Sequence, residues 1–226
     1  MNKLILNYPT TPYPSPALIN LELLYQDAFL LVVNKPAGLL SVPGRGADKT
    51  DSLATRIQTQ FTNALIVHRL DRDTSGILVL ARGTAMHRLL SMAFAAREVD
   101  KRYVAQVAGK PKQDSGEIDL PIIVDWPNRP KQHVNYVIGK PSLTRYSLLS
   151  HDDASNTSLL ELEPVTGRTH QLRVHLSEIG HPILGDTLYG GGVANSAERL
   201  LLHARLLSFS HPFSNEPLQF ICEPPF

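Results

Sequence analysis

Apolar residues in this chain fall into short blocks whose spacing predicts β-strands. The continuous apolar runs at 29–33 and 77–81 are typical of strands buried on both faces, because they leave no polar position for solvent. An alternating run over 101–107 predicts a strand with one buried face. Further strands are expected at 143–149, 158–162 and 200–209.

Three segments have the spacing of helices instead. The pattern predicts a short helix over 53–61 and a longer one from a capping Thr84 to about Glu98, with apolar residues recurring on one face. A third helix is expected from about Thr169 to Gly180, since glycine often follows a helix C-terminus. Strands outnumber helices and short turns join many neighbours, which favours a mixed α+β fold over a doubly wound one.

Two segments lack such periodicity. Residues 1–20 contain four prolines and are expected to form an extended arm on the surface. Residues 110–141 are rich in proline, glycine and asparagine, which predicts a long loop, and loops of this length usually have a function. Neither an internal repeat nor a shift in composition marks a boundary, so residues 1–226 are interpreted as a single domain.

Composition narrows the class of protein. With 226 residues, of which 42% are hydrophobic and 19% charged, the chain can bury a core and does not resemble a disordered segment. No apolar stretch approaches the length of a membrane span, and the single cysteine, Cys222, favours a reducing, cytoplasmic environment. The net charge of +1 does not indicate nucleic-acid binding, although a local basic face matters more than the total.

Candidate chemistry gathers first at His68–Gly76. This segment places two arginines, one histidine and two aspartates ahead of a strand that is expected to be buried. Charges against the edge of a core need partners. In a structural interpretation, Asp71 or Asp73 caps a turn and pairs with an arginine. In a functional interpretation, an arginine keeps a carboxylate ionised for use as a nucleophile or base.

A second cluster, Gly167–His175, spans a glycine turn and the start of the third predicted helix. Free backbone amides at a helix start favour anions such as phosphate. Arg173 lies one turn beyond Thr169 on the polar side of the helix, where it can meet a carboxylate from another segment. The alternative is a solvated helix face with Thr169 as its cap. Tyr103 either packs within the sheet or stacks on a nucleobase, with its hydroxyl available for proton transfer.

Residue spacing argues against metal and nucleotide cofactors. His170 and His175 are five residues apart, which is wrong for one helical face, and a lone cysteine cannot build a zinc site. Neither a Gly-Lys-Ser/Thr phosphate loop nor a complete dinucleotide-binding glycine motif occurs in the sequence. We therefore expect no metal and no organic cofactor.

Five segments, taken in order, resemble the motifs of the RluA family of pseudouridine synthases. They are Val33–Leu39, His68–Gly76, Lys101–Ala105, Gly167–His175 together with His181–Asp186, and Leu201–Ala204. Ordered motifs are far more specific than any single one. Asp125–Gln132 resembles a loop of those members that have dual specificity for ribosomal RNA and tRNA. The S4 RNA-binding domain of many members is not seen, since the catalytic segment begins almost at the N-terminus.

This resemblance implies a pseudouridine synthase fold, with helices flanking a mixed, largely antiparallel central sheet and a catalytic cleft across the sheet. It implies isomerisation of specific uridines in structured RNA, in 23S rRNA and tRNA anticodon stem-loops, without a cofactor. Asp71 is the expected catalytic carboxylate, Arg173 its partner that keeps it ionised, and Tyr103 the ring that stacks on uracil and assists removal of the C5 proton.

The resemblance also implies residues that hold the RNA. Arg69 is expected to fill the gap left by a flipped nucleotide, and Leu202 or its neighbour to pack against the base. The basic loop within 110–141 is expected to close over phosphates. Arg72, Arg129, Lys131, Arg168 and His170 complete the expected RNA contacts. A monomer acting in the cytoplasm, with no membrane partner, is the default interpretation.

Two other functions stay open at this point. The chain can be a non-catalytic RNA-binding or ribosome-assembly factor with the same fold, or a hydrolase that releases uracil from free nucleosides. The sequence also leaves open whether Asp71 attacks C1′, attacks C6 or removes the C2′ proton.

Overall fold

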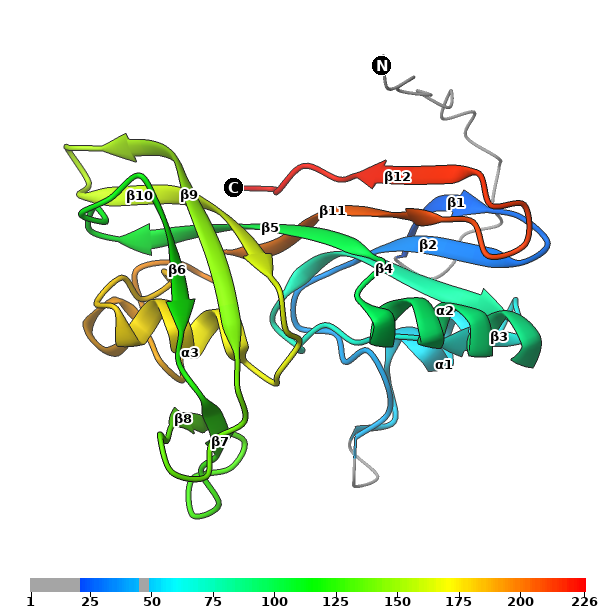
Figure 1. Ribbon diagram of the computed structural model, residues 1–226, viewed down its shortest axis with the longest axis horizontal. Helices are drawn as coiled ribbons and strands as arrows, with labels where there is room; N and C mark the ends of the chain where they lie inside the picture. The colour runs from blue at the N-terminus through cyan, green and yellow to red at the C-terminus, as the bar shows by residue number, and fades with distance from the viewer. Residues whose placement is uncertain (1–20, 45–48) are drawn as a thin grey trace.

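A ten-stranded mixed sheet organises the computed structural model of the protein, which describes residues 21–44 and 49–226 (Figure 1). The strand order along its main path is β1 (Glu22–Gln26), β2 (Leu30–Lys35), β4 (Ser75–Arg82), β11 (Leu202–Ser210), β5 (Asp100–Ala108), β10 (Thr157–Pro164), β9 (Leu143–Asp152) and β6 (Ser115–Asp119). In addition, β3 (Ala64–Ile66) pairs with β4, and β12 (Pro217–Ile221) pairs with β11. Only the pair of β4 with β11 is parallel in this sheet of described residues. The predicted α+β class with a mostly antiparallel sheet is confirmed.

The first half of the sheet is covered on both faces. Helix α1 (Leu53–Gln58) packs Leu53 and Ile57 against one face of β2 and β4, whereas helix α2 (Thr84–Ala96) packs Met86 and Leu90 against the other. This arrangement explains why β2 and β4 are continuous apolar runs, since a strand with two covered faces has no solvent position. The strands predicted at 29–33 and 77–81 are confirmed by β2 and β4.

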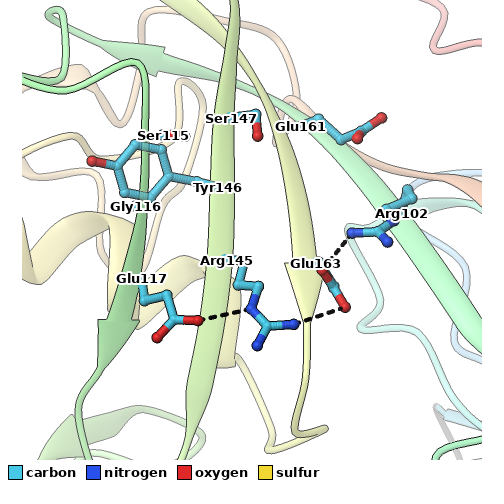
Figure 2. A pocket seen from close by; sticks show the side chains of 9 residues that line it. All are labelled: Arg102, Ser115, Gly116, Glu117, Arg145, Tyr146, Ser147, Glu161 and Glu163. Atoms are coloured by element: carbon cyan, nitrogen blue, oxygen red, sulfur yellow. Dashed lines mark hydrogen bonds and ion pairs between the residues drawn. The ribbon is translucent and has the colours of Figure 1, made fainter.

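The second half of the sheet is covered on one face only. Helix α3 (Gln171–Glu178) packs Leu172 and Leu176 against β5 and β10. Side chains of β10 are alternately buried and partly exposed, which is the pattern of a strand with one solvated face. On the solvated face, charged residues of β5, β6, β9 and β10 lie side by side (Figure 2).

The prediction of a long loop over 110–141 is wrong. This segment contains β6, which pairs with β9, and a separate two-stranded sheet of β7 (Ile122–Val124) and β8 (Gln132–Val134). The β7–β8 hairpin extends away from the main sheet in Figure 1. Strands of three to five residues between prolines carry too little periodicity to be recognised, because their partners lie elsewhere in the chain.

Helix ends differ from the prediction in detail. Gly83 rather than Thr84 is the N-cap of α2, and α1 ends at Gln58. Thr169 does not cap α3: the N-cap is His170, in a left-handed conformation with φ 55°, and the turn before it is held by Gln171 Oε1, which accepts from the Arg168 amide at 3.0 Å. A short 3-10 helix, η2 (Gly191–Val193), follows. The extended arm expected over 1–20 lies outside the described residues. No helix among those described is long and apolar enough to cross a membrane.

Candidate active site

A cleft of about 880 Å³ lies beside the sheet, with the end of α2 and the start of α3 in its lining. Eight of the predicted site residues line it: Asp71, Tyr103, Arg173, Arg69, Arg72, Arg168, His170 and Leu202. They come from the loop before β4, from β5, from the start of α3 and from β11. Arg129 and Lys131 do not line the cleft, although Pro130 between them does.

The loop that carries Asp71 is anchored on both sides of that residue. Lys35 is fully buried, and its Nζ donates to the carbonyl oxygens of Arg72 at 2.9 Å, Leu39 at 2.7 Å and Pro36 at 2.8 Å. Ser41 Oγ donates to the Leu70 carbonyl at 2.7 Å and accepts from the Leu70 amide at 3.1 Å. Burial lowers the pKa of Lys35 to about 7, but three carbonyl acceptors fit the ammonium form, because a neutral amine has only two N–H donors.

Glycine is required where this loop enters β4. Gly76 has φ +114°, and a Cβ atom built on it would lie 2.3 Å from the carbonyl oxygen of Ala204 on β11. No side chain can be accommodated at that distance, so a larger residue would push β4 away from β11. The short parallel contact between these strands therefore depends on Gly76.

His68, at the start of the same segment, is held against β4 and α2. Its Nε2 accepts a hydrogen bond from the Val79 amide at 3.1 Å, and its ring stacks on Phe94 with 4.5 Å between centroids. Burial, assisted by the positive charge of Lys101, lowers the pKa of His68 to about 3. The imidazole is therefore neutral near pH 7, as an acceptor nitrogen requires.

Asp71 is partly exposed in the cleft, with 27% of its side-chain surface accessible. Its nearest cationic atom is Arg173 Nη1, which lies 3.9 Å from Asp71 Oδ2. Among the residues that the structure describes, no donor forms a hydrogen bond with this carboxylate, while its backbone carbonyl accepts from the Thr74 amide at 3.2 Å. The carboxylate is thus held in place by its backbone and is free to contact a substrate.

The principal partner of Arg173 is Asp186 rather than Asp71. Arg173 donates from Nε and Nη2 to the two carboxylate oxygens of Asp186 at 2.8 and 2.7 Å, and both side chains are buried. The expected place of Arg173 on a polar helix face is therefore wrong. The bidentate bond leaves Nη1 directed toward Asp71, so Asp186 orients the guanidinium.

Asp186 is ionised in spite of its burial. Burial alone would raise the pKa of its carboxyl group, but the hydrogen bonds and charge of Arg173, with amide hydrogen bonds from Leu188 and Tyr189, hold the pKa below its usual value. The segment His181–Asp186 carries a motif in the sequence, yet the aspartate itself gave no signal of a role. Its partner is thirteen residues away in the chain, and only the fold brings them together.

Tyr103 and Leu202 form an apolar wall beside Asp71. Tyr103 projects from β5 and contacts both apolar clusters that meet under the cleft, and Leu202, which is 2% exposed, lies on the neighbouring strand β11. Burial raises the pKa of Tyr103 well above its ordinary value, and the charge of Asp71 adds to this. The phenol therefore keeps its proton at neutral pH.

A tyrosine that was not predicted connects the cleft to the β7–β8 hairpin. The hydroxyl of Tyr189 forms a hydrogen bond with His170 Nδ1 at 2.7 Å and accepts from the Gln132 amide at 2.8 Å. The guanidinium of Arg173 lies 5.2 Å from the centre of its ring. Burial raises the pKa of Tyr189 to about 12 and lowers the pKa of His170 below its usual value. Tyr189 thereby connects the hairpin, His170 and Arg173.

The cleft is strongly basic although the whole chain is nearly neutral. Its lining holds six basic side chains, Arg69, Arg72, Arg97, Lys101, Arg168 and Arg173, and Asp71 is the one carboxylate in that lining among the described residues. Such a concentration of positive charge attracts a polyanion. Asp73 is not in this lining, and it pairs with Arg72 at 2.8 Å, as the structural interpretation of this segment expected for one of its two aspartates.

The β7–β8 hairpin presents its basic residues to solvent. Arg129 is exposed, and its guanidinium lies 4.4 Å from the ring centre of Trp126, which is 64% exposed. The hairpin therefore offers a cation and an aromatic face together beside the cleft. No cluster of three or more potential metal ligands occurs in the part of the chain that the structure describes.

Comparisons with known proteins agree with this geometry. The profile of a family described as RNA pseudouridylate synthase matches residues 29–178. A dual-specificity RNA pseudouridine synthase RluA from Yersinia pestis is 52% identical over 204 residues, which cover 90% of this chain and 98% of that protein. The protein of the same name from Escherichia coli (strain K12) is 51% identical, covering 88% of this chain and 91% of the relative.

Solved structures support the same relationship. Human RNA Pseudouridylate Synthase Domain Containing 1 has a TM-score of 0.76 and 32% identity, covering 94% of this chain and 86% of that one. The sheet and the basic cleft are thus those of an RNA-modifying isomerase. The chain belongs to the RNA pseudouridylate synthase family, and it is an RNA pseudouridine synthase.

Proposed function

We propose that this enzyme isomerises specific uridines in two classes of structured RNA, large-subunit ribosomal RNA and tRNA anticodon stem-loops. Two observations support dual specificity. The relatives named above are called dual-specificity enzymes, and the segment Asp125–Gln132 resembles a loop of family members that act on both ribosomal RNA and tRNA. The observation that carries the proposal is the partly exposed carboxylate of Asp71, the one acid in the described lining of a cleft that also holds six basic side chains.

In the proposed reaction, Asp71 is the catalytic carboxylate. The N1–C1′ bond of the uridine breaks, the uracil turns, and a C5–C1′ bond forms while the proton from C5 is lost and N1 gains one. Atoms and electrons balance without an oxidant, a reductant or a cofactor. Arg173 Nη1, oriented by Asp186, keeps a positive charge within 3.9 Å of the Asp71 carboxylate through the reaction.

Tyr103 and Leu202 are proposed to hold the uracil. An aromatic ring on the wall of the cleft suits base stacking. Because the pKa of Tyr103 is raised, its resting phenol suits packing and hydrogen-bond donation better than it suits direct removal of the C5 proton. Exposed Arg69 would fill the gap left by the flipped nucleotide, which offsets part of the cost of unstacking, a few kcal/mol.

The remaining basic residues are proposed to contact the RNA backbone. Arg72, Arg168 and His170 line the cleft, while Arg129 and Lys131 on the hairpin would contact RNA outside it. We further propose that the chain acts as one catalytic domain and as a monomer. Free nucleosides carry no phosphate, so a nucleoside hydrolase would have no use for this charge, and a non-catalytic factor would have no use for Asp71.

The test is to map pseudouridine in total RNA from a strain that lacks the gene. We expect loss at one or more positions, restoration by the wild-type gene, and none by Asp71→Asn, which removes the charge with little change of shape. Turnover by the purified variant should fall by at least a factor of about 10³, by analogy with loss of a catalytic carboxylate or nucleophile in other enzymes, while it still binds RNA. Modification by Asp71→Asn would overturn the assignment of Asp71, and release of free uracil would indicate a hydrolase.

A further inference from the structure

Two basic residues of the cleft, Arg97 and Lys101, have no role in the reaction described above. Both line the cleft beside His68 and Phe94. Arg97 follows the last residue of α2, and Lys101 is the second residue of β5. The chain therefore brings two cations together across the short connection between a helix and a strand.

Arg97 occupies a backbone position that suits glycine. Its φ is 62° and its ψ is 32°, and the amide of Glu98 donates to the Ala93 carbonyl at 3.0 Å. This is the left-handed residue that closes many helices, where glycine is preferred because a Cβ atom is unfavourable. An arginine here makes the helix end less stable than glycine would, so its side chain calls for another explanation.

Lys101 and Arg97 line the same cleft and repel each other electrostatically. Burial lowers the pKa of the Lys101 ammonium, and the positive charge of Arg97 adds to this. Among residues 21–44 and 49–226, neither side chain forms an ion pair. The nearby Asp100 opposes the lowering of the Lys101 pKa, but its carboxylate pairs at 3.1 Å with Arg102 on the other face of β5. Arg97 is exposed and Lys101 is partly buried in the lining of the same cleft. Two such cations, neither of them in an ion pair among the described residues, form a site for an anion.

The position of Lys101 relates this site to the substrate. Lys101 and Tyr103 are two residues apart on β5 and line the same cleft, which separates their Cα atoms by about 7 Å. A nucleobase stacked on Tyr103 would place a neighbouring backbone phosphate within reach of a lysine at that spacing. Arginine adds a planar fork that binds phosphate oxygens in pairs, whereas lysine adds a compact charge.

We propose that Arg97 and Lys101 form a subsite for one RNA phosphate adjacent to the flipped uridine. This inference rests on the proposed function, since it takes RNA as the substrate. The subsite positions the strand on one side of the target nucleotide. Its residues are positioning and binding residues, and they take no part in the chemistry.

The experiment uses Arg97→Gly, Lys101→Gln and, as a matched control, Arg88→Gln, an exposed arginine of the same helix outside the cleft. The probe is an RNA fragment that the wild-type enzyme modifies. We expect the dissociation constant to rise about fivefold to tenfold for each subsite variant, as for loss of one charged contact. The slope of the logarithm of the association constant against the logarithm of the salt concentration should become shallower by about 0.7–0.9. The control should match wild type in both measurements.

Thermal unfolding separates binding from structure. Arg97→Gly should unfold at the same or a higher temperature than wild type, because glycine suits the left-handed position, while its RNA affinity falls. A second arm replaces single phosphates of the RNA with neutral methylphosphonates. One substitution next to the target should weaken wild-type binding about as much as Arg97→Gly does. The same substituted RNA should bind Arg97→Gly only slightly more weakly than unmodified RNA does.

Wild-type affinity and salt dependence in both variants, or no sensitive phosphate near the target, would overturn the subsite. A parallel fall of melting temperature and affinity in Arg97→Gly would reduce Arg97 to a structural residue and would equally overturn it. These results differ from failure of the proposed function, in which the wild-type enzyme itself would form no pseudouridine in RNA. If the wild-type enzyme forms pseudouridine and the subsite variants bind RNA as well as wild type does, the subsite is contradicted and the proposed function is not.

Discussion

Lys101 and Arg102 are neighbours on β5 and carry the same charge, yet they lie on opposite faces of the sheet in different surroundings. Arg102 belongs to a ladder on the solvated face, where Glu117 pairs with Arg145 at 2.8 Å and Glu163 lies 3.6 Å from Arg145 and 2.5 Å from Arg102 (Figure 2). Lys101 has no such partner in the described residues. The same residue types therefore form a neutralised surface on one face and a basic cleft on the other.

This difference shows why the net charge of +1 did not indicate RNA binding. The other face carries paired charges, which contribute almost no field at a distance. The described lining of the cleft holds six basic side chains and one acid; Arg72 and Arg173 pair with Asp73 and Asp186 outside the lining, and the other four cations form no ion pair among the described residues. Field strength at a surface depends on local excess charge rather than on the sum over the molecule. The four cations of the cleft that form no ion pair among the described residues distinguish it from the paired face.

The largest effect is expected at the buried pair that supports the cleft. Asp186→Ala would leave the Arg173 guanidinium buried without its bidentate partner, and loss of one partner of a buried pair costs about 3–5 kcal/mol. Urea unfolding would measure the loss of stability, and single-turnover assays the loss of activity. A stability change below about 1 kcal/mol would show that Arg173 does not depend on Asp186.

A pH effect is expected at His68, next in size. Its folded pKa of about 3 lies below the unfolded value of 6.5, so the unfolded chain binds more protons between these limits. The contribution of His68 to stability is complete above pH 6.5 and is lost as the pH falls toward 3, at up to about 1.4 kcal/mol per pH unit. Unfolding titrations should show this slope, reduced in His68→Gln and retained in the exposed His133→Gln. Equal slopes in all three proteins would contradict this account.

A matched pair of arginine substitutions compares the two faces directly. Arg168→Gln in the cleft and Arg145→Gln in the ladder remove the same charge. The first should weaken RNA binding about fivefold and make the salt slope shallower by about 0.7–0.9, as loss of one phosphate contact does. The second should leave both values unchanged. Filter binding at several salt concentrations decides the question, and equal effects of the two variants would mean that RNA is attracted by the total charge.

The smallest effect is expected for Glu163→Gln, which removes the carboxylate shared by Arg102 and Arg145. Ion pairs at exposed positions contribute about 1 kcal/mol or less, so the free energy of unfolding should change by no more than that, with turnover unaffected. A clear change in RNA affinity would show that the ladder face also meets the substrate.

Part of this structure could be predicted because its signals are local. The apolar runs of β2 and β4 indicated strands without knowledge of their partners, and Gly180, which has φ +84° just after α3, marked the end of that helix. Asp71 and Tyr103 could be singled out because each lies in a short motif. Their presence in one cleft follows from strand order, which the resemblance supplied and periodicity did not.

The sequence by itself determined the buried strands β2 and β4, the three helices and the residue types available for chemistry, but not the short strands β6, β7 and β8. Only the tertiary structure decided how residues are paired: Arg173 with Asp186, Lys35 with three carbonyls of two loops, and Arg97 beside Lys101 in one cleft, where neither forms an ion pair among the described residues. The physical reason is that backbone preferences act over a few residues, whereas ion pairs and burial depend on distances in space. Those distances are set by the pairing of β4, β11 and β5, strands that lie far apart in the chain.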